Sequence, residues 1–430
     1  MKILFVTPPP YLPNRLHRNR SFDLIRILAI KNEVHLLSVT TYKEEPKEFR
    51  EIKKVCKSVS IIYLNPLKAL LSCVFFPFLP FEVAFCKSNL AKKAIVNIVR
   101  TKNIDLIYAK RLRSAIFIPE LNIPIILDTT DAMSMFYNRL YNRSNFPKKI
   151  IYKLEEIKYK AFEKKIMKRI NNWIVCSTID QKYLQKFGRD VNVHLVPNPV
   201  DADYFSPSRS PSATSKVERT KELACLTGVG RQRPRLLRGG YVNSLLFRGL
   251  MDKQVNIDSC LFFIKEIMPL VKKKIKDVRL FIVGPKPHRS IQKLHDGKSI
   301  FVTGFVEDIR RYMAETAISI CPVRIGSGTR FKILQAWSMG KPVVSTSIGV
   351  EGLVFKKDYN IAIANTQKEF AEKIIRLLQD KKYYSTLQKN GLKSVVAEHS
   401  FNAVKEKLEE VFSNVYQRIG RLLDPETSSG

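Results

Sequence analysis

Short, strongly apolar runs recur along the chain, and longer amphipathic segments separate most of them. In the first half such runs include ILFV at residues 3–6 and IDLIYA at residues 104–109. Strands that are apolar on both faces and are joined by helices are typical of a parallel sheet with helices on both sides. The other runs of this half are EVHLLSV (33–39), VSIIYL (59–64), PIILDT (124–129) and NWIVCST (172–178).

The second half repeats this scheme and predicts a second sheet. A helix of about five turns is expected over residues 256–275, and the strands expected around it are SLLFRG (244–249), RLFIVG (279–284), IFVTG (300–304), ISICPV (318–323) and PVVST (342–346). We therefore predict an α/β protein of two Rossmann-like, doubly wound parallel-sheet domains that face each other across a cleft. Ligands should bind at the carboxyl ends of the strands. The expected segments are domain 1–200, linker 201–244, domain 245–400, and a helix with a frayed tail at 401–430.

The charge of the chain limits the classes of partner. Lys and Arg number 74 against 39 Asp and Glu, so the net charge is +35. Such a field attracts nucleic acid, an anionic membrane or anionic small molecules, although it also fits a lysine-rich composition without a partner. The sequence lacks zinc-finger spacing, a basic zipper and an aromatic single-strand-binding motif, so we expect no nucleic acid. The seven cysteines include no C-x-x-C pair, which favours a reducing cytoplasm and predicts no zinc site.

Two segments stand out from the sheet pattern. ALLSCVFFPFLPFEVAFC, from Ala69 to Cys86, is too interrupted by Pro77 and Pro80 to span a membrane. It fits a surface that dips into one leaflet of an anionic membrane, and equally a helix and loop that pack on the sheet. Residues 208–241 hold eight basic and two acidic residues without helical or strand period, so we expect a flexible basic insertion that either tethers the chain to a membrane or polyanion or has no function.

The stretch RIGSGTRFKILQAWSMG (324–340) predicts a strand, a glycine loop and a helix in succession. Gly326 and Gly328 allow backbone N–H groups to turn toward a ligand, and Thr329 can cap the helix. A helix N-terminus attracts anions, and Arg330 and Lys332 add full positive charges. The spacing is neither that of a P-loop nor G-x-G-x-x-G. The alternative is a tight loop with incidental charge.

With this block in view, the chain resembles a family 4 glycosyltransferase of the GT-B fold, from the group linked to exopolysaccharide and other surface-sugar synthesis. The matching pieces run almost end to end, and only the basic insertion and the tail fall outside them. The pieces are MKILFVTPPPYLP…NRSFDLIRILA, VHLVPNPVDADYF, LLFRGLMDKQVNIDS, LFIVGPKP and VTGFVEDIRRYMAETAISICPVRIGSGTRFKILQAWSMGKPVVSTSIGVEGL.

The resemblance implies that the C-terminal domain binds a nucleotide diphosphate sugar as donor and that the N-terminal domain binds the acceptor. It places the diphosphate against the glycine loop and against a second loop after the first strand of the domain. The nucleobase, the ribose and the transferred sugar of the donor would contact residues at the carboxyl ends of later strands. The residues expected to bind the donor are Arg248, Gly249, Lys253, Gly284, Gly304, Glu307, Gly326, Ser327, Gly328, Thr329, Arg330, Lys332, Gln335 and Glu351.

Two positions depart from the family pattern. Many relatives carry two glutamates where this chain has Ser327 and Gln335. Glutamine keeps an acceptor oxygen for a ribose hydroxyl but loses the charge. Donor binding could survive at lower affinity, or the chain could be an inactive partner subunit.

The acceptor side carries several basic residues near predicted strand ends. NRLHRNR follows the first strand, and KRLRS follows the strand at 104–109; the residues expected to bind an acceptor phosphate are Arg15, His17, Arg18, Arg20, Lys110 and Arg113. A solvated basic loop is the alternative for the first group. Asp128 and Asp131 of DTTD are the candidate catalytic residues, which would orient or deprotonate the acceptor hydroxyl, with a helix cap as the alternative.

Together these features predict a glycosyltransferase that moves a hexose, with retention, from a nucleotide diphosphate sugar to a lipid-linked or polysaccharide acceptor. The glycine loop, the helix dipole and Arg or Lys would stabilise the leaving diphosphate, so we expect no cofactor and no metal. We expect a cytoplasmic enzyme at the inner face of the cell membrane. The alternatives are a catalytically impaired, membrane-docked partner subunit and a polyanion-binding protein.

Overall fold

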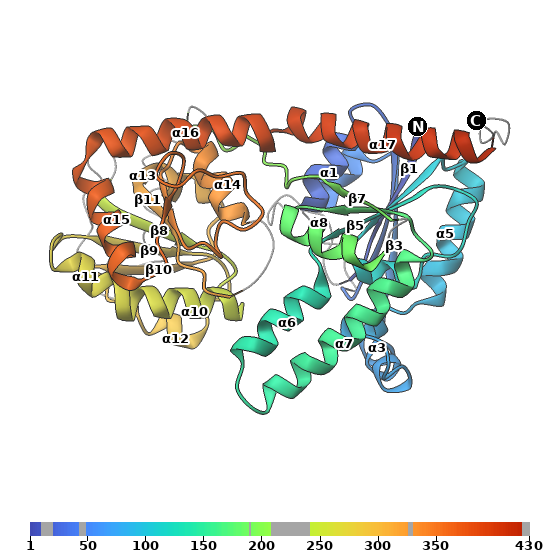
Figure 1. Ribbon diagram of the computed structural model, residues 1–430, viewed down its shortest axis with the longest axis horizontal. Helices are drawn as coiled ribbons and strands as arrows, with labels where there is room; N and C mark the ends of the chain where they lie inside the picture. Colours follow the sequence, from blue (N-terminus) through green and yellow to red (C-terminus); the bar gives the residue numbers. More distant parts are fainter. Residues whose placement is uncertain (10–19, 43–48, 189–190, 208–240, 326–329, 424–430) are drawn as a thin grey trace. The chain divides into compact units, whose positions relative to one another are not determined.

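The computed structural model describes residues 1–9, 20–42, 49–188, 191–207, 241–325 and 330–423, and the chain forms two compact units (Figure 1). Unit 1 comprises residues 1–199 with 401–430, and unit 2 comprises residues 200–400. The helix expected after residue 400 is α17 (Phe401–Leu423), and it packs on unit 1. The basic insertion expected over 208–241 lies outside the described residues, except that Tyr241 begins a strand.

Unit 1 is built on a parallel sheet in the order β3-β2-β1-β4-β5-β6-β7. All six strands predicted in this half are present, and β7 was missed because it is short and half polar. The strands are β1 (Lys2–Thr7), β2 (Glu33–Thr40), β3 (Ser58–Tyr63), β4 (Leu106–Lys110), β5 (Ile125–Thr130), β6 (Asn172–Val175) and β7 (Asn192–Leu195).

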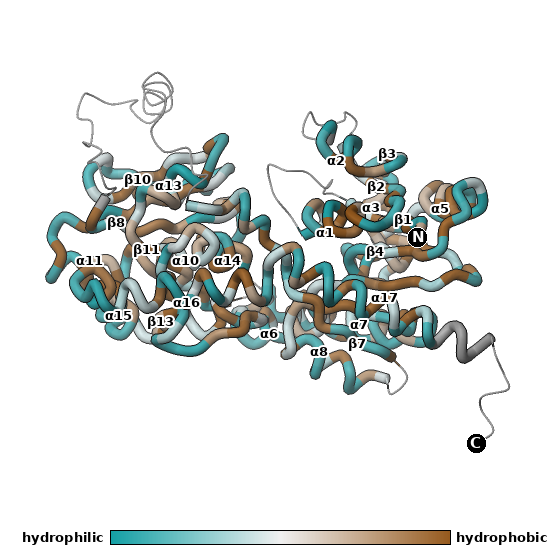
Figure 2. The backbone as a smooth tube through the Cα atoms, turned by 90° about the horizontal axis from the view of Figure 1, so that it is seen from above, coloured by the Kyte–Doolittle hydropathy of each residue, from teal (hydrophilic) through white to brown (hydrophobic). Residues whose placement is uncertain are grey.

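Helices cover both faces of this sheet because successive strand residues point to opposite sides. In β1, Ile3 and Phe5 pack with α1, α2 and α17, whereas Leu4 and Val6 pack with α5 and α7. Along the helices, apolar and polar residues alternate (Figure 2). The helices are α1 (Arg20–Leu28), α2 (Phe49–Val55), α3 (Pro66–Phe75), α4 (Phe81–Phe85), α5 (Asn89–Lys102), the 3-10 turn η1 (Leu112–Ile116), α6 (Met133–Arg143), α7 (Lys148–Met167), α8 (Thr178–Leu184) and the 3-10 turn η2 (Gln185–Phe187).

Unit 2 is built on a second parallel sheet, in the order β10-β9-β8-β11-β12-β13. The five predicted strands are present, and the two-residue β13 was not foreseen. The strands are β8 (Tyr241–Arg248), β9 (Arg279–Val283), β10 (Ile300–Gly304), β11 (Thr316–Cys321), β12 (Val343–Ser345) and β13 (Ala362–Ile363).

The long helix expected at the start of unit 2 contains a π-helical turn. A regular helix would need a backbone N–H at position 269, which Pro269 lacks, and the π-helical turn lies just before this proline. The helices are α10 (Gln254–Phe262), the π turn η4 (Phe263–Ile267), α11 (Met268–Lys272), α12 (Arg289–Gln292), α13 (Ile309–Glu315), α14 (Phe331–Ser338), α15 (Gln367–Gln379) and α16 (Lys381–His399). Among the described residues, no helix is long and apolar enough to cross a membrane.

Candidate functional site

The strand order of the sheet in unit 2 reverses between β8 and β11. A doubly wound sheet binds ligands next to such a reversal, at the edge formed by the carboxyl ends of the strands. Arg248 is the last residue of β8, and α14 follows β11 after a loop. The glycine loop itself, Gly326, Ser327, Gly328 and Thr329, lies outside the described residues. Arg330 and Lys332 stand at the start of α14, directly after that loop.

Two half-buried cations, Arg248 and Lys332, lie close together at this carboxyl edge of the sheet. The Lys332 ammonium donates a hydrogen bond to Asn256 Oδ1 at 2.9 Å and lies 4.5 Å from the centre of the Phe247 ring. Burial, together with the neighbouring Arg330 and Arg248, lowers the pKa of Lys332 to about 8. Burial also lowers the pKa of Arg248 to about 10. Arg248 donates a long bond of 3.5 Å to the Phe331 carbonyl oxygen, and its Nε has no partner among the described residues.

Three glycine positions line the strand ends next to these cations. Gly249 donates to the Val283 carbonyl and Gly284 donates to the Gly304 carbonyl, at 3.1 and 3.0 Å. Gly284 has a φ of +154°, and a Cβ there would lie 1.8 Å from the Gly249 carbonyl oxygen. The backbones of adjacent loops thus approach each other as only glycine permits. The prediction that these three glycines share one site is consistent with this geometry.

Gln335 lies one turn along α14 from Lys332 and is buried. Its Oε1 has no hydrogen-bond partner among the residues that the structure describes. A buried acceptor without a partner costs about 1–3 kcal/mol. The side chain therefore has an unused acceptor for a ligand hydroxyl.

In unit 1 the equivalent switch point lies between β1 and β4, and a buried charge network centres on Asp128 next to it. Asp128 Oδ2 accepts from Arg20 Nε at 3.0 Å and from the Tyr108 hydroxyl at 2.7 Å. Asp128 Oδ1 accepts from Lys110 Nζ at 2.8 Å, and that ammonium also donates to Thr130 Oγ1 at 2.6 Å. Burial alone would raise the pKa of Asp128, but Arg20 and Lys110 hold it well below its usual range.

The Arg20 guanidinium also donates hydrogen bonds to residues 196–198, which follow β7. It donates to the carbonyl oxygens of Val196 and Pro197 and to Asn198 Oδ1, at 2.8–2.9 Å. Four of its five N–H groups are thereby used within unit 1. Arg20 therefore braces the start of α1 against residues 196–198, and little of it is left for a ligand.

Two strand ends beside this network have strained backbone. Arg111, after β4, has a φ of 69°, and Thr130, at the end of β5, has a φ of 71°. For a β-branched threonine such a value is an outlier, and outliers of this kind cluster at functional sites. Asp131 follows at once; its side chain keeps 18% exposure, and its Oδ2 lies 3.6 Å from an Arg111 nitrogen.

Known proteins resemble this chain in sequence and in fold. Residues 242–380 match the family described as glycosyl transferases group 1. The matched residues all belong to unit 2 and span about a third of the chain. An uncharacterized 44.6 kDa protein of the cps region of Klebsiella pneumoniae is 26% identical over 184 residues, which is 40% of this chain. The matched stretch spans 45% of that relative, less than half of its length.

Solved structures match nearly the whole chain in fold. Sucrose-phosphate synthase from Thermosynechococcus elongatus aligns with a TM-score of 0.67 and 16% identity, over 97% of this chain and 99% of its own. HepE from Anabaena, in complex with UDP, aligns with a TM-score of 0.63 and 15% identity, over 96% and 100%. The predicted GT-B fold of two doubly wound sheets is confirmed.

Unit 2 brings part of the predicted donor set together and leaves the rest apart or undescribed. Arg248, Gly249, Gly284, Gly304 and Lys332 meet at one edge of the sheet. Lys253 is exposed at the start of α10, Glu307 is exposed after β10, and Glu351 lies in a turn after β12. The binding roles of all these residues remain predictions.

In the predicted acceptor set, Arg15, His17 and Arg18 lie outside the described residues. Arg113 pairs with Glu82 of α4, and this pairing raises the pKa of Arg113 against the effect of burial. With Arg20 and Lys110 engaged by Asp128, the three described basic residues all have carboxylate partners. Asp128, saturated by cations and hydrogen bonds, is a weak base, so the geometry favours a positioning role for it over the catalytic role expected from the sequence.

Sequence reasoning missed two residues that position these groups. Asn256 holds Lys332 through Oδ1 and donates from Nδ2 to the Leu250 carbonyl oxygen at 2.9 Å. Tyr108 looks like an ordinary strand residue in the sequence, yet its hydroxyl supports Asp128. Neither carries a sequence signal beyond its place near a strand end. Among the described residues, no three His, Cys, Asp or Glu side chains gather as a metal site, and metal independence stays a prediction.

Proposed function

We propose that this protein is a family 4 glycosyltransferase that moves a hexose, with retention, from a nucleotide diphosphate sugar to a lipid-linked or polysaccharide acceptor in cell-surface glycan synthesis. The match of residues 242–380 to glycosyl transferases group 1 and the relative from a cps region support this class of reaction. Related folds were solved with UDP and with UDP-glucose, so a uridine diphosphate sugar is the first donor to test.

One observation carries the proposal: two half-buried cations at the switch point of unit 2 have no carboxylate partner among the described residues. Lys332 contacts a neutral amide, and Arg248 contacts a carbonyl oxygen. Burial disfavours both charges, as their lowered pKa values record. A diphosphate would offset this cost, because it supplies negative charge where the protein supplies none.

The same groups would serve the chemical step. When the bond between the sugar and the diphosphate breaks, negative charge grows on the leaving phosphate. Lys332, Arg248 and the N-terminus of α14 would stabilise that charge, and no metal is required for this role. Gln335 Oε1 would accept a hydrogen bond from a ribose hydroxyl.

On the acceptor side we propose Asp131 as the residue that accepts the proton of the attacking hydroxyl. Its carboxylate is partly exposed and follows the strained Thr130. Asp128 would position this strand end through its network with Arg20, Tyr108 and Lys110.

We also propose that the protein works in the cytoplasm, at the inner face of the cell membrane. The net charge of +35 suits an anionic leaflet. The seven cysteines include no C-x-x-C pair, which suits a reducing compartment.

Thermal unfolding with UDP, GDP, ADP and their sugar derivatives tests the donor site. We expect one nucleotide class to raise the melting temperature of the wild type and of Lys265→Ala, an exposed lysine of unit 2. The shift should be lost in Lys332→Ala. If folded protein shows no shift with any nucleotide, the donor site is refuted. Binding without any turnover would instead favour the impaired partner subunit.

A further inference from the structure

Several apolar residues of the α6–α7 hairpin of unit 1 are exposed on its outer face. Phe146, in the turn between the helices, is 79% exposed, and Ile150, Leu154 and Ile157 of α7 are all more than half exposed. Positions 150, 154 and 157 are spaced i, i+4 and i+7, so they form one stripe along the helix. We call these four residues the hairpin stripe. Such a stripe in a water-soluble protein marks an interaction surface.

In α7 the acidic residues are buried and most of the lysines are exposed, although charged residues of either sign are usually exposed. Its three acidic residues, Glu155, Glu156 and Glu163, are buried. Glu155 accepts from the Phe81 backbone N–H and Glu163 from Ser134, whereas Glu156 pairs with Lys153. The exposed residues beside the hairpin stripe are instead lysines: Lys148, Lys149, Lys153, Lys160, Lys164 and Lys165. The outer face of α7 is therefore apolar and positively charged.

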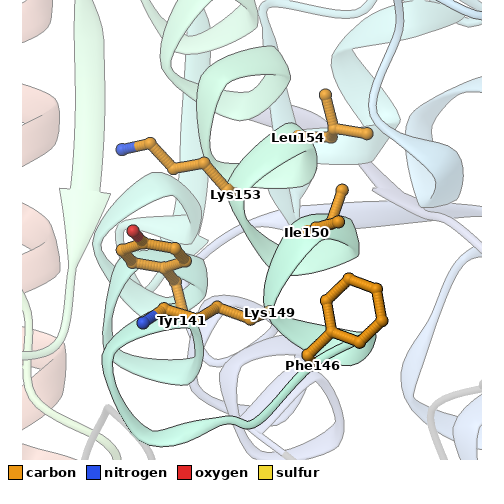
Figure 3. Close-up of a pocket in the computed structure, with 6 residues that line it drawn as sticks. All are labelled: Tyr141, Phe146, Lys149, Ile150, Lys153 and Leu154. Atoms are coloured by element: carbon orange, nitrogen blue, oxygen red, sulfur yellow. The ribbon is translucent and has the colours of Figure 1, made fainter.

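The tip of the hairpin forms an open groove of about 310 Å³ between Tyr141, Phe146, Lys149, Ile150, Lys153 and Leu154. Figure 3 shows both lysine side chains extending toward Tyr141, while Phe146, Ile150 and Leu154 lie on the other side. The two ammonium groups are 5.0 and 5.2 Å from the centre of the Tyr141 ring. One side of the groove is thus cationic and the other apolar, which suits an amphiphile with an anionic head.

A second apolar surface adjoins this helix. In α3 only Ala69 is buried, and Phe78, in the turn that follows, is 90% exposed. The same segment is tied to α7, because the Phe81 N–H donates to Glu155 Oε2 at 3.0 Å. In Figure 1 the hairpin and α3 extend from the same side of unit 1. The exposed members of this α3 surface are Leu67, Leu70, Leu71, Val74, Phe75, Phe78 and Phe81.

We propose that the hairpin stripe and the α3 surface together insert into the interfacial region of an anionic lipid bilayer, with the α7 lysines on the phosphate head groups. A helix with an apolar face flanked by lysines lies in such an interface. A second copy of this chain fits poorly, because its equally basic surface would repel the first. The α3 and α6 helices contain no acidic residue, and Glu82, next to Phe81, is paired with Arg113, so the surface is predominantly basic.

This inference rests on the proposed function in one respect, namely that the acceptor is lipid-linked. It names the surface that would hold the enzyme where such an acceptor resides. It also extends the expectation from the sequence, which considered residues 69–86 and not the hairpin.

Flotation of the full chain with vesicles tests the proposal. We expect binding to vesicles of equal parts phosphatidylglycerol and phosphatidylcholine, and much weaker binding to pure phosphatidylcholine. The triple variant Ile150→Ser/Leu154→Ser/Ile157→Ser should bind more than about tenfold more weakly, since it removes apolar contacts with the acyl chains. The matched control Leu392→Ser/Val396→Ser, exposed on α16, should bind like the wild type.

A second variant separates charge from apolar insertion. Lys148→Gln/Lys149→Gln should weaken binding to the anionic vesicles by about 30-fold, because each lysine near such a surface contributes about fivefold. Nucleotide binding should be unchanged in every variant, so a failure of the donor site and a failure of this surface give different results. The proposal is overturned if the wild type does not float, or if the triple variant floats equally well. It is also overturned if the wild type is a dimer without lipid that the triple variant dissociates.

Discussion

The depressed pKa of Lys332 makes a quantitative prediction about nucleotide binding. Burial and two neighbouring guanidinium groups lower this pKa from its ordinary value of 10.5 to about 8. Only the charged ammonium attracts a diphosphate, so binding should restore the pKa toward its ordinary value. By linkage, the affinity for a nucleoside diphosphate must then fall as the pH rises through the pKa of the free protein.

The magnitude follows from the two pKa values. About nine tenths of the Lys332 side chains are charged at about pH 7, and about one tenth at about pH 9. If the complex regains the ordinary pKa, the dissociation constant should rise about tenfold between these two pH values, or about 1.4 kcal/mol. The terminal phosphate of the nucleotide, with a second pKa of about 6, is about nine tenths ionised at about pH 7 and almost fully ionised above about pH 8, so its own titration adds little to this change.

Isothermal titration calorimetry across this pH range measures the effect. Above about pH 8, binding should also take up a proton, which appears as a dependence of the binding enthalpy on the buffer. Lys332→Arg is the control, because arginine stays charged and titration of the nucleotide base affects both proteins equally. If the wild type and Lys332→Arg show the same pH profile, Lys332 does not contact the diphosphate and the argument fails.

Three further perturbations test the interiors of the two units. Asp128→Asn leaves the buried Arg20 beside a neutral amide and should cost about 3–5 kcal/mol of unfolding free energy, measured by denaturant titration; a loss below about 1 kcal/mol would contradict the network. Gly284→Ala places a Cβ 1.8 Å from the Gly249 carbonyl oxygen and should lower the melting temperature by several degrees or abolish folding, and an unchanged melting temperature would contradict this geometry. Burial raises the pKa of Glu163 from 4.5 to about 7, so the wild type should lose stability relative to Glu163→Gln as the pH rises from about 4.5 through 7; the difference should reach about 3 kcal/mol, and parallel stability curves would refute it.

The two sheets were predictable because their strands are buried on both faces. Runs such as ILFV and IDLIYA are apolar at nearly every position, which is typical of strands that are buried on both faces of a parallel sheet. The strands that escaped prediction, β7 and β13, are short, and β7 alternates polar and apolar residues. The π turn before Pro269 was also missed, because the apolar period continues through it.

The grouping of cations and glycines at the strand ends of unit 2 was predictable from local chemistry, whereas the partners of the basic residues of unit 1 were not. A glycine loop that leads into a helix with Arg330 and Lys332 is a local signal for an anion. The partners of Arg20, by contrast, lie more than 100 residues away, at Asp128 and at residues 196–198. Nothing in the sequence distinguishes a basic residue committed to such partners from one that faces a ligand.

The hairpin stripe illustrates the same limit for apolar residues. An apolar period in α7 is expected of any helix that packs on a sheet, and part of α7 does pack there through Tyr159, Phe162 and Ile166. The exposure of Ile150, Leu154 and Ile157 follows from where the hairpin leaves the sheet, which only the tertiary structure reveals.

Release of nucleoside diphosphate from a panel of nucleotide sugars, measured with and without a membrane extract as a source of acceptor, tests the central claim most directly. The account predicts release from one nucleotide class, stimulation by the extract, and loss of both in Lys332→Ala but not in Lys265→Ala. The opposite result, in which folded protein releases no diphosphate from any donor or Lys332→Ala is as active as the wild type, would contradict sugar transfer at this site.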